Sequence, residues 1–352
     1  MQVCTVRYVG LFLADSLDVR WLDGDESVVP PSTAPRLPTH GNGPSHMGSA
    51  CGMRYRRRRR LGGLSMRLLS HGSPRTLICM STPLTVLEVP QWQGSGAPNA
   101  SRLSAGARTA AQLVDGTCRV AVATTERPGA IRNGVRALDE LAANAVATRE
   151  ALSKTNEPWL TVGGECNADL TPIAVAHERY GDDLTLVWID AHPDVYAPGE
   201  LSSGSFHAMV VRTLLGEGPA ELVPDRPLRV DQVRLAGRRV VTEPEVAFLA
   251  RSGLRWHGVA DAEEVLVGLA GPVHLHIDLD VLDPSEFTSV GYSEPNGMSV
   301  DQLVTLITRI QNVVSAAICE YAPGQEPVTA EEDVIKRIAA AFNFRDRAPT
   351  VR

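Results

Sequence analysis

From about residue 80 onward, short apolar segments alternate with longer amphipathic ones. The apolar segments are rich in β-branched residues and are predicted to be buried strands: residues 84–89, 119–124, 158–164, 184–190, 232–237, 273–280 and 315–323. The amphipathic segments 129–155, 167–181 and 299–314 are predicted to be helices, and Ser299 is a natural N-cap for the last of them. Strands that alternate with helices favour a parallel sheet covered on both faces. The pattern therefore predicts an α/β fold.

The first part of the chain has a different character. Residues 1–79 contain 11 Lys and Arg against 5 Asp and Glu, clusters of Pro, Gly and Ser, and the run RYRRRRRLGG from Arg54. Such a segment buries too little apolar surface to offset its ordering entropy. The arginine run is typical of a tail that binds nucleic acid or a membrane surface, but we expect a disordered extension or a start codon assigned too early, since Met80 precedes the first strand. The folded domain is predicted to span residues 80–346, with a tail at 347–352.

Composition narrows the class of protein. The formal net charge is −7 and aromatic residues make up 5% of the chain, so we expect no nucleic-acid partner for the body of the protein. No apolar run approaches the roughly 20 residues that a membrane helix needs, so no membrane partner is expected either. The six cysteines form no C-x-x-C pair, which argues against a disulfide framework and favours a reducing cytoplasm.

Polar side chains gather where the predicted strands end. The strand at 184–189 runs into D-A-H-P-D, the strand at 273–277 runs into D-L-D, the strand at 158–162 runs into G-G-E-C-N, and the last strand runs into Glu320. In open parallel sheets, ligands bind beyond the carboxyl ends of the strands. We therefore expect these side chains to form one site.

The two acidic motifs suit divalent cations. Asp190, His192 and Asp194 are two positions apart, so on an extended segment their side chains point the same way, and Asp278 and Asp280 repeat this spacing on a second strand. Carboxylates and imidazole suit Mn²⁺, Fe²⁺ or Zn²⁺. Four carboxylates crowded together repel one another unless cations neutralise them, which predicts a binuclear centre. A lone D-x-D would also fit a surface loop or a single Mg²⁺ site.

These motifs resemble those of the ureohydrolases, the arginase and agmatinase relatives. DAHPD, HIDLDVLDP, SGSFH and the glycine-glycine-acid strand end occur in that family's order, and the resemblance covers roughly residues 84–345. It implies a three-layer α/β/α sandwich around a mainly parallel sheet of about eight strands, two Mn²⁺ ions per chain, and often trimers or hexamers. The residues that match the family's metal ligands are Asp190, His192, Asp194, Asp278 and Asp280, and Asp190 and Asp278 match the bridging pair.

The resemblance also implies a reaction. His207, thirteen positions after Asp194, matches a loop histidine that shuttles protons, and Glu320 matches the acid that contacts the substrate guanidinium. Ser203 stands where arginases contact the α-carboxylate. Hydroxide generated between the two ions would attack the carbon of a small guanidino or amidino compound, and Asp280 would pass a proton to the leaving amine. The products would be urea, or a substituted urea, and an amine.

Two features depart from the family. Its first metal ligand is a histidine, where this chain has Cys166, whose soft thiolate suits Zn²⁺ better than Mn²⁺. One of the two ions is then bound by Cys166, is bound more weakly, or is lost. Alternatively, Cys166 is a core residue that binds no metal. Tyr196 replaces the asparagine of true arginases, and Val240 and Thr242 lie near the places of an acidic loop that holds the α-amino group. We therefore expect substrate contacts from Tyr196, and these changes weaken the assignment of L-arginine and favour a different guanidino or amidino compound.

Two alternatives stay open. A single-metal amidohydrolase of the deacetylase kind shares the implied fold, and counting the metal ions per chain would distinguish it. A protein that keeps the fold for assembly or ligand sensing, without catalysis, would also accommodate the changes at Cys166 and Tyr196.

Overall fold

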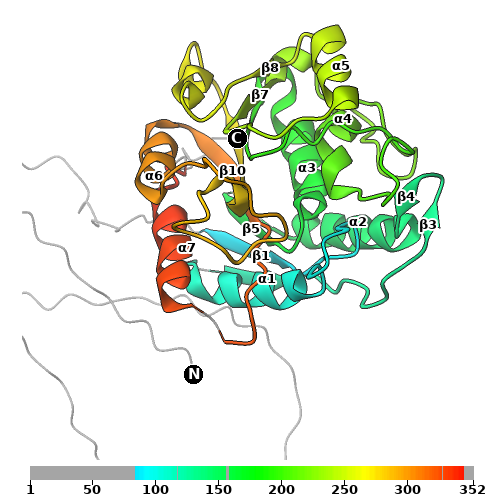
Figure 1. Ribbon diagram of the computed structural model, residues 1–352, viewed down its shortest axis with the longest axis horizontal. Helices are drawn as coiled ribbons and strands as arrows, with labels where there is room; N and C mark the ends of the chain where they lie inside the picture. The colour runs from blue at the N-terminus through cyan, green and yellow to red at the C-terminus, as the bar shows by residue number, and fades with distance from the viewer. Residues whose placement is uncertain (1–83, 117, 156–157, 327, 345–352) are drawn as a thin grey trace, which may run out of the picture. The chain divides into compact units, whose positions relative to one another are not determined.

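A computed structural model describes residues 84–116, 118–155, 158–326 and 328–344. Residues 1–79, Met80 and the tail at 347–352, for which the sequence made predictions, lie outside the described residues. The centre of the described part is an eight-stranded sheet with the order β2-β1-β5-β10-β9-β6-β7-β8, in which neighbouring strands pair in parallel (Figure 1). The predicted α/β fold with a mainly parallel, eight-stranded sheet is confirmed.

All seven predicted strands are present, and the eighth is a two-residue edge strand. The strands of the main sheet are β1 Thr85–Val89, β2 Cys118–Ala121, β5 Trp159–Gly163, β6 Thr185–Ile189, β7 Val233–Ala236, β8 Arg255–Trp256, β9 Val273–Asp278 and β10 Val313–Cys319. The α-helices are α1 Arg102–Leu113, α2 Leu138–Ser153, α3 Leu170–Tyr180, α4 Val210–Leu214, α5 Glu243–Ser252, α6 Val300–Arg309 and α7 Thr329–Ala341.

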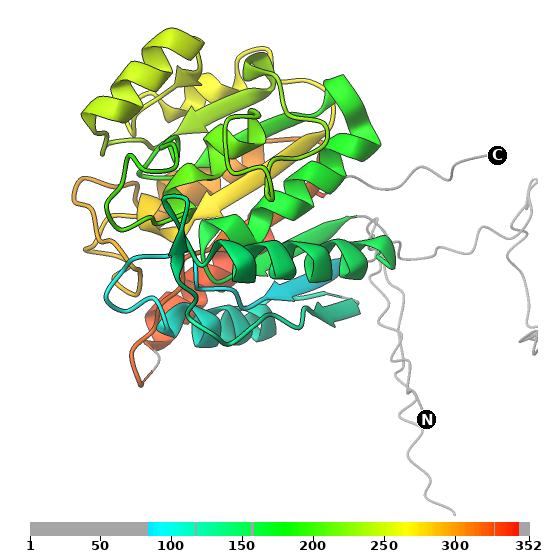
Figure 2. The ribbon, with the colours of Figure 1, turned by 90° about the vertical axis from the view of Figure 1, so that its right-hand side faces the viewer.

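The helices cover the two faces of the sheet and make three layers (Figures 1 and 2). Alternate residues of a strand point to opposite faces, so β5 sends Leu160 and Val162 into a core shared with α1, α6 and α7, and Trp159 into a core on the face of α2 and α3. The central strands are buried on both faces, which explains why they read as continuous apolar runs.

The predicted helix at 129–155 is wrong in its first third. Residues Ile131–Arg132 (β3) and Val135–Arg136 (β4) form an antiparallel hairpin, and α2 begins only at Leu138. The two turn residues, Asn133 and Gly134, have φ values of 53° and 77°. Asn-Gly is a strong signal for a two-residue hairpin because both positions need positive φ. That signal overrides the apolar periodicity of the segment.

The predicted helix at 299–314 begins as expected and ends early. The Ser299 hydroxyl accepts a hydrogen bond from the Gln302 N–H at 3.2 Å, and the Gln302 side chain accepts one from the Ser299 N–H at 2.8 Å. This reciprocal cap fixes the start of α6. The helix ends at Arg309, and β10 already begins at Val313, so the last predicted helical residues belong to the sheet.

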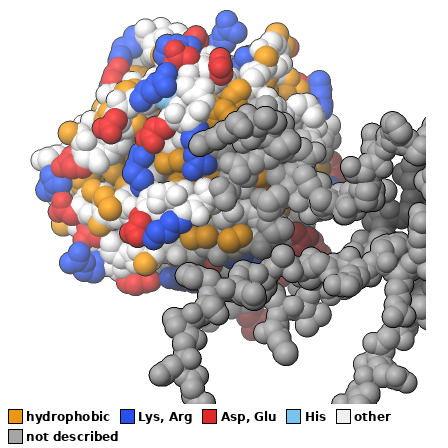
Figure 3. Space-filling model, turned by 180° about the vertical axis from the view of Figure 1, so that it is seen from behind, with side chains coloured by type: hydrophobic (Ala, Val, Ile, Leu, Met, Phe, Trp, Pro, Cys, Tyr) orange, Lys and Arg blue, Asp and Glu red, His pale blue; other side chains and the backbone are white. Residues whose placement is uncertain are grey.

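The surface carries charges of both signs. On the face seen in Figure 3, basic and acidic side chains are interspersed over the residues that the structure describes. None of the described helices is both long enough and apolar enough to span a bilayer.

Candidate metal centre

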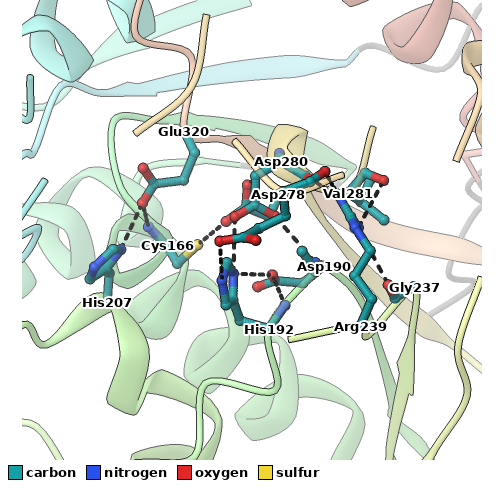
Figure 4. A network of polar contacts seen from close by, with 12 residues as sticks. Cys166, Asp190, His192, His207, Gly237, Arg239, Asp278, Asp280, Val281 and Glu320 are labelled. Atoms are coloured by element: carbon teal, nitrogen blue, oxygen red, sulfur yellow. Dashed lines mark hydrogen bonds and ion pairs between the residues drawn. The ribbon is translucent and has the colours of Figure 1, made fainter. Parts of the chain in front are cut away.

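The four central strands of the sheet bring the predicted site residues together. β5, β10, β9 and β6 are consecutive neighbours, although they lie far apart in the chain. Their carboxyl ends carry Cys166, Glu320, Asp278 and Asp190, and all four side chains are buried. Figure 4 shows these residues facing one another across the edge of the sheet. The expectation that the strand ends form one site therefore agrees with the structure.

Each acidic motif turns the chain sharply at the end of its strand. Asp190 accepts a hydrogen bond from the backbone N–H of His192 at 2.6 Å, and Asp278 accepts one from the N–H of Asp280 at 2.8 Å. These local bonds compete with continued strand pairing. The D-x-H-x-D segment is therefore not extended as predicted: Asp194 has a φ of 53°, and the turn rather than the strand period brings it into the site.

One side of the centre, here called the imidazole side, consists of Asp190, His192 and Asp280. His192 Nδ1 lies 3.0 Å from Asp280 Oδ2 and 3.5 Å from Asp190 Oδ1. Burial lowers the pKa of His192, but the Asp280 and Asp190 carboxylates outweigh it and hold that pKa well above its ordinary value. Burial likewise raises the pKa of Asp190, and the contact with His192 outweighs it and lowers the pKa. The three side chains thus compensate one another's charge.

The other side, here called the thiol side, consists of Cys166, Asp278, Glu320 and Asp194. The Cys166 thiol donates to Asp278 Oδ2 at 3.0 Å. Burial, reinforced by neighbouring carboxylates, raises the pKa values of Cys166, Asp278 and Asp194 well above their ordinary range. Asp194 Oδ2 is buried without a hydrogen-bond partner. This side gathers acidic groups with no basic partner within its own group, which is why their raised pKa values favour the protonated forms.

His207 and Glu320 form a pair beside the thiol side. His207 Nδ1 lies 3.1 Å from Glu320 Oε1, and the same oxygen accepts a hydrogen bond from the Cys166 N–H at 3.3 Å (Figure 4). Burial lowers the pKa of His207, and the neighbouring Glu320 outweighs it and raises the pKa. Glu165, buried and bonded to Gln91 at 2.7 Å, has a pKa raised to about 7, mainly by burial. The acidic groups Glu320 and Glu165 thus create, next to the candidate metal ligands, an electrostatic environment that favours a cation.

A cavity of about 230 Å³ opens onto both sides of the centre. Its lining includes His192, Asp278, Asp280 and Glu320, and all of the predicted substrate contacts line it. The remaining lining residues are Asp194, Tyr196, Leu201, Ser203, Ser205, His207, Ala208, Val240, Thr242, Glu245 and Tyr292. The Ser203 and Ser205 hydroxyls are 2.8 Å apart. No lysine or arginine lines this cavity within the described part of the chain, so its electrostatics favour a cation.

Comparison with known proteins agrees with this geometry. The model of the arginase family matches residues 97–342. The chain belongs to the arginase family. It is 26% identical over 242 residues to an arginase from Staphylococcus aureus, covering 62% of this chain and 80% of that one. It is also 32% identical over 169 residues to the N(1)-aminopropylagmatine ureohydrolase of Thermus thermophilus, covering 47% of this chain and 55% of that protein.

The fold is likewise that of solved arginase structures. Entamoeba histolytica arginase, solved in complex with L-ornithine, superposes with a TM-score of 0.66 at 21% identity, covering 74% of this chain and 98% of that one. At this identity the superposition shows a common fold and says nothing about substrate. The recognised family is thus confirmed together with the α/β/α architecture.

A buried column of polar side chains behind the imidazole side of this arginase-family chain was not predicted from the sequence. The Trp188 indole N–H donates to Asp190 Oδ2 at 2.9 Å, and the Trp188 ring stacks on His276 at 3.5 Å and 3°. His276 and His274 both contact Asp169 Oδ2, at 2.9 and 2.8 Å, and Asp169 is fully buried. Trp188 and His276 precede Asp190 and Asp278, two of the candidate metal ligands, by two positions, so strand alternation alone would have placed them on the face of the site.

Arg239 is a second residue that the sequence did not indicate. Its guanidinium donates to the backbone carbonyls of Asp280 at 2.6 Å and Val281 at 3.2 Å (Figure 4). It also donates to the carbonyl of Pro295 at 3.0 Å. Arginine is suited to this because its planar fork offers five donors. Arg239 therefore fixes the turn after Asp278 and ties it to the loop that carries Glu294. Only the tertiary structure shows where those carbonyls point.

Proposed function

We propose that this chain is a metal-dependent ureohydrolase that cleaves a C–N bond of a guanidino or amidino compound. The products are urea, or a substituted urea, and an amine. The observation that carries the proposal is the convergence of the two acidic motifs, His207 and Glu320 on one cavity of about 230 Å³. Family membership supports the reaction class, and the identity to the curated relatives leaves the substrate open.

The side chains fit two divalent cations. Three clusters have ligand atoms within 4.8 Å of one another, namely Asp190 with His192 and Asp280, Cys166 with Asp190 and Asp194, and Cys166 with Asp278 and Glu320. Burial, and after it the charge of neighbouring carboxylates, raises the pKa values of Asp278 and Asp194, and Asp194 Oδ2 has no hydrogen-bond partner; a bound cation would compensate these groups. We propose Mn²⁺ as the bound ion, because most of the donor atoms are carboxylate oxygens. Cys166 would be a thiolate ligand, which suits Zn²⁺ better than Mn²⁺.

Bound cations would supply a water activated as the nucleophile and would stabilise the charge that develops on the reacting carbon's substituents. The protein's own groups supply the rest. Glu320 receives the guanidinium through charge-assisted hydrogen bonds. Asp280, which lines the cavity, carries the proton to the leaving amine. His207, held by Glu320 at 3.1 Å, exchanges protons with solvent.

The cavity walls support a substrate other than L-arginine. Tyr196, Leu201 and Val240 contribute apolar surface to the cavity lining, and Tyr196 and Val240 stand where the resemblance places contacts to a charged amino-acid end. Ser203 keeps a hydroxyl in the wall, paired with Ser205. A guanidino compound whose far end is less polar than an amino acid fits these walls better.

The assembly and the compartment belong to the same proposal. Family resemblance supports a trimer or hexamer, and the widely spaced cysteines support a reducing cytoplasm. Sedimentation of the metal-loaded chain would measure the assembly directly.

A urea-release assay tests the function. The metal-loaded protein would be assayed with arginine, agmatine, guanidinobutyrate and hydroxyarginine, and metal content would be measured on the same sample. We expect urea from at least one compound and two ions per chain, with His207→Ala retaining metal but losing most turnover. Two bound ions with no urea from any compound would contradict the proposal. One ion per chain with release of acetate from acetylated amines would favour a deacetylase instead.

A further inference from the structure

Tyr292 lies over the candidate site, and none of the residue roles proposed above involves it. It lies in the loop between β9 and α6, and 36% of its surface is exposed. Its ring centroid is 5.6 Å from that of His207, at an interplanar angle of 28°, and 6.3 Å from that of His192, at 72°. The ring therefore spans the space between one histidine of the metal centre and one of the Glu320 pair, and it lines the same cavity.

Next to this ring is an oxygen without a partner. Glu320 is 3% exposed, its Oε1 is already engaged by Cys166 and His207, and its Oε2 is buried without a hydrogen bond. A buried carboxylate oxygen normally has a donor, so this one is available for a ligand. Gly291 lies beside this oxygen: a Cβ at that position would stand 3.4 Å from Oε2 and 3.2 Å from the Ala97 Cβ.

The aromatic ring of Tyr292, from the loop, and the unpartnered Oε2 of Glu320, which follows β10, thus belong to residues that line the same cavity. The charge of Glu320 contributes, after burial, to raising the pKa of Tyr292, which reflects their proximity. An aromatic face attracts cations electrostatically, and planar cations such as guanidinium also stack on it. A carboxylate oxygen accepts the in-plane N–H groups of the same planar cation.

We infer that Tyr292 is a specificity-determining residue, which lays its ring on the face of a planar cationic group while Glu320 Oε2 accepts that group's N–H. This inference rests on the proposed function, which identifies the planar cationic group as a guanidinium. It goes further in assigning to Tyr292 the selection of planar cations over neutral planar groups. The ring, and not the hydroxyl, supplies the selection. Tyr292→Phe should therefore preserve it and Tyr292→Leu, which keeps an apolar side chain of moderate size, should remove it.

Calorimetry on the metal-loaded protein tests the inference without turnover. The probes are methylguanidinium and uncharged N-methylurea, which share a planar shape. We expect the wild type and Tyr292→Phe to bind methylguanidinium with dissociation constants within about twofold of each other. Tyr292→Leu should bind it roughly five- to thirty-fold more weakly, the range that a cation–π contact implies, with little change for N-methylurea.

Three results would overturn the inference: no binding of methylguanidinium by the wild type, unchanged binding by Tyr292→Leu, or equal losses in the Phe and Leu variants. The last would show that the hydroxyl is the contact. Thermal unfolding of each variant checks that the fold is intact. The proposed function can fail separately, because ring-dependent binding without urea release would sustain this inference and contradict only the reaction. Urea release together with unchanged methylguanidinium binding in Tyr292→Leu would support the proposed function and contradict this inference.

Discussion

The two sides of the candidate metal centre differ in how their buried charge is compensated. On the imidazole side, His192 sits between Asp190 and Asp280 and neutralises part of their charge within the protein. On the thiol side, the neutral Cys166 thiol offers one hydrogen bond to Asp278, while Asp194 keeps an unpartnered oxygen. The thiol side therefore depends more on an external cation, although its cysteine must lose a proton before it can bind one.

The difference shows why one substitution in a metal site matters. A histidine at position 166 would offer a neutral nitrogen ligand and would lose no proton on binding metal at neutral pH. A cysteine whose pKa is raised by burial and by Asp278 holds its proton more firmly. Metal binding on this side must overcome that cost, so we expect the two sides to differ in affinity.

Removing an acid from the thiol side should have the largest effect. Asp278→Ala deletes a buried carboxylate that contacts Cys166 and begins the turn to Asp280. We expect loss of metal together with at least a thousandfold loss of turnover, as for groups that act as one catalytic unit. Metal per chain would be measured by mass spectrometry. Asp301→Ala, at a side chain 84% exposed on α6, is the matched control and should keep its metal. Full metal content in Asp278→Ala would rule out its assignment as a bridging ligand.

Changing the support of the imidazole side should have an intermediate effect. Trp188→Phe keeps the ring stacked on His276 but removes the N–H that donates to Asp190 Oδ2. Groups that orient metal ligands from behind are typically worth about 10- to 100-fold in affinity, so we expect roughly a tenfold loss of Mn²⁺ affinity. Competition with a chelator would measure it. Trp159→Phe, on another part of the same face, is the control. Equal affinities would mean that His192 and Asp280 hold Asp190 without help.

The smallest expected effect is a gain. Cys166→His should tighten Mn²⁺ binding by roughly tenfold, because imidazole suits this ion better than a thiolate. Cys166→Ser, which keeps the size but offers a weaker ligand, should not tighten it. The comparison is made by titrating metal-free protein and resolving the two affinities. No change in the histidine variant would show that position 166 does not face the ions.

Much of the fold could be predicted because local patterns and tertiary structure agree. The apolar strands, the cap at Ser299 and the acids at the strand ends all follow from side-chain period and chemistry. The prediction failed where two local signals competed, as at Asn133-Gly134, whose turn preference outweighed the helical periodicity around it. It also failed at Asp194, which a left-handed turn brings to the site instead of an extended strand.

The sequence alone determined which residues are candidates for the site: the two acidic motifs, Cys166, His207 and Glu320 stand out by their identity and spacing. The tertiary structure decided how they are arranged, because the strand order β5-β10-β9-β6 brings together segments that are more than 100 residues apart in the chain. It also decided the surroundings, namely Trp188 behind Asp190, Arg239 behind Asp280 and Tyr292 over Glu320. Their contacts are made across elements, and no local period in a single chain encodes a contact of that kind.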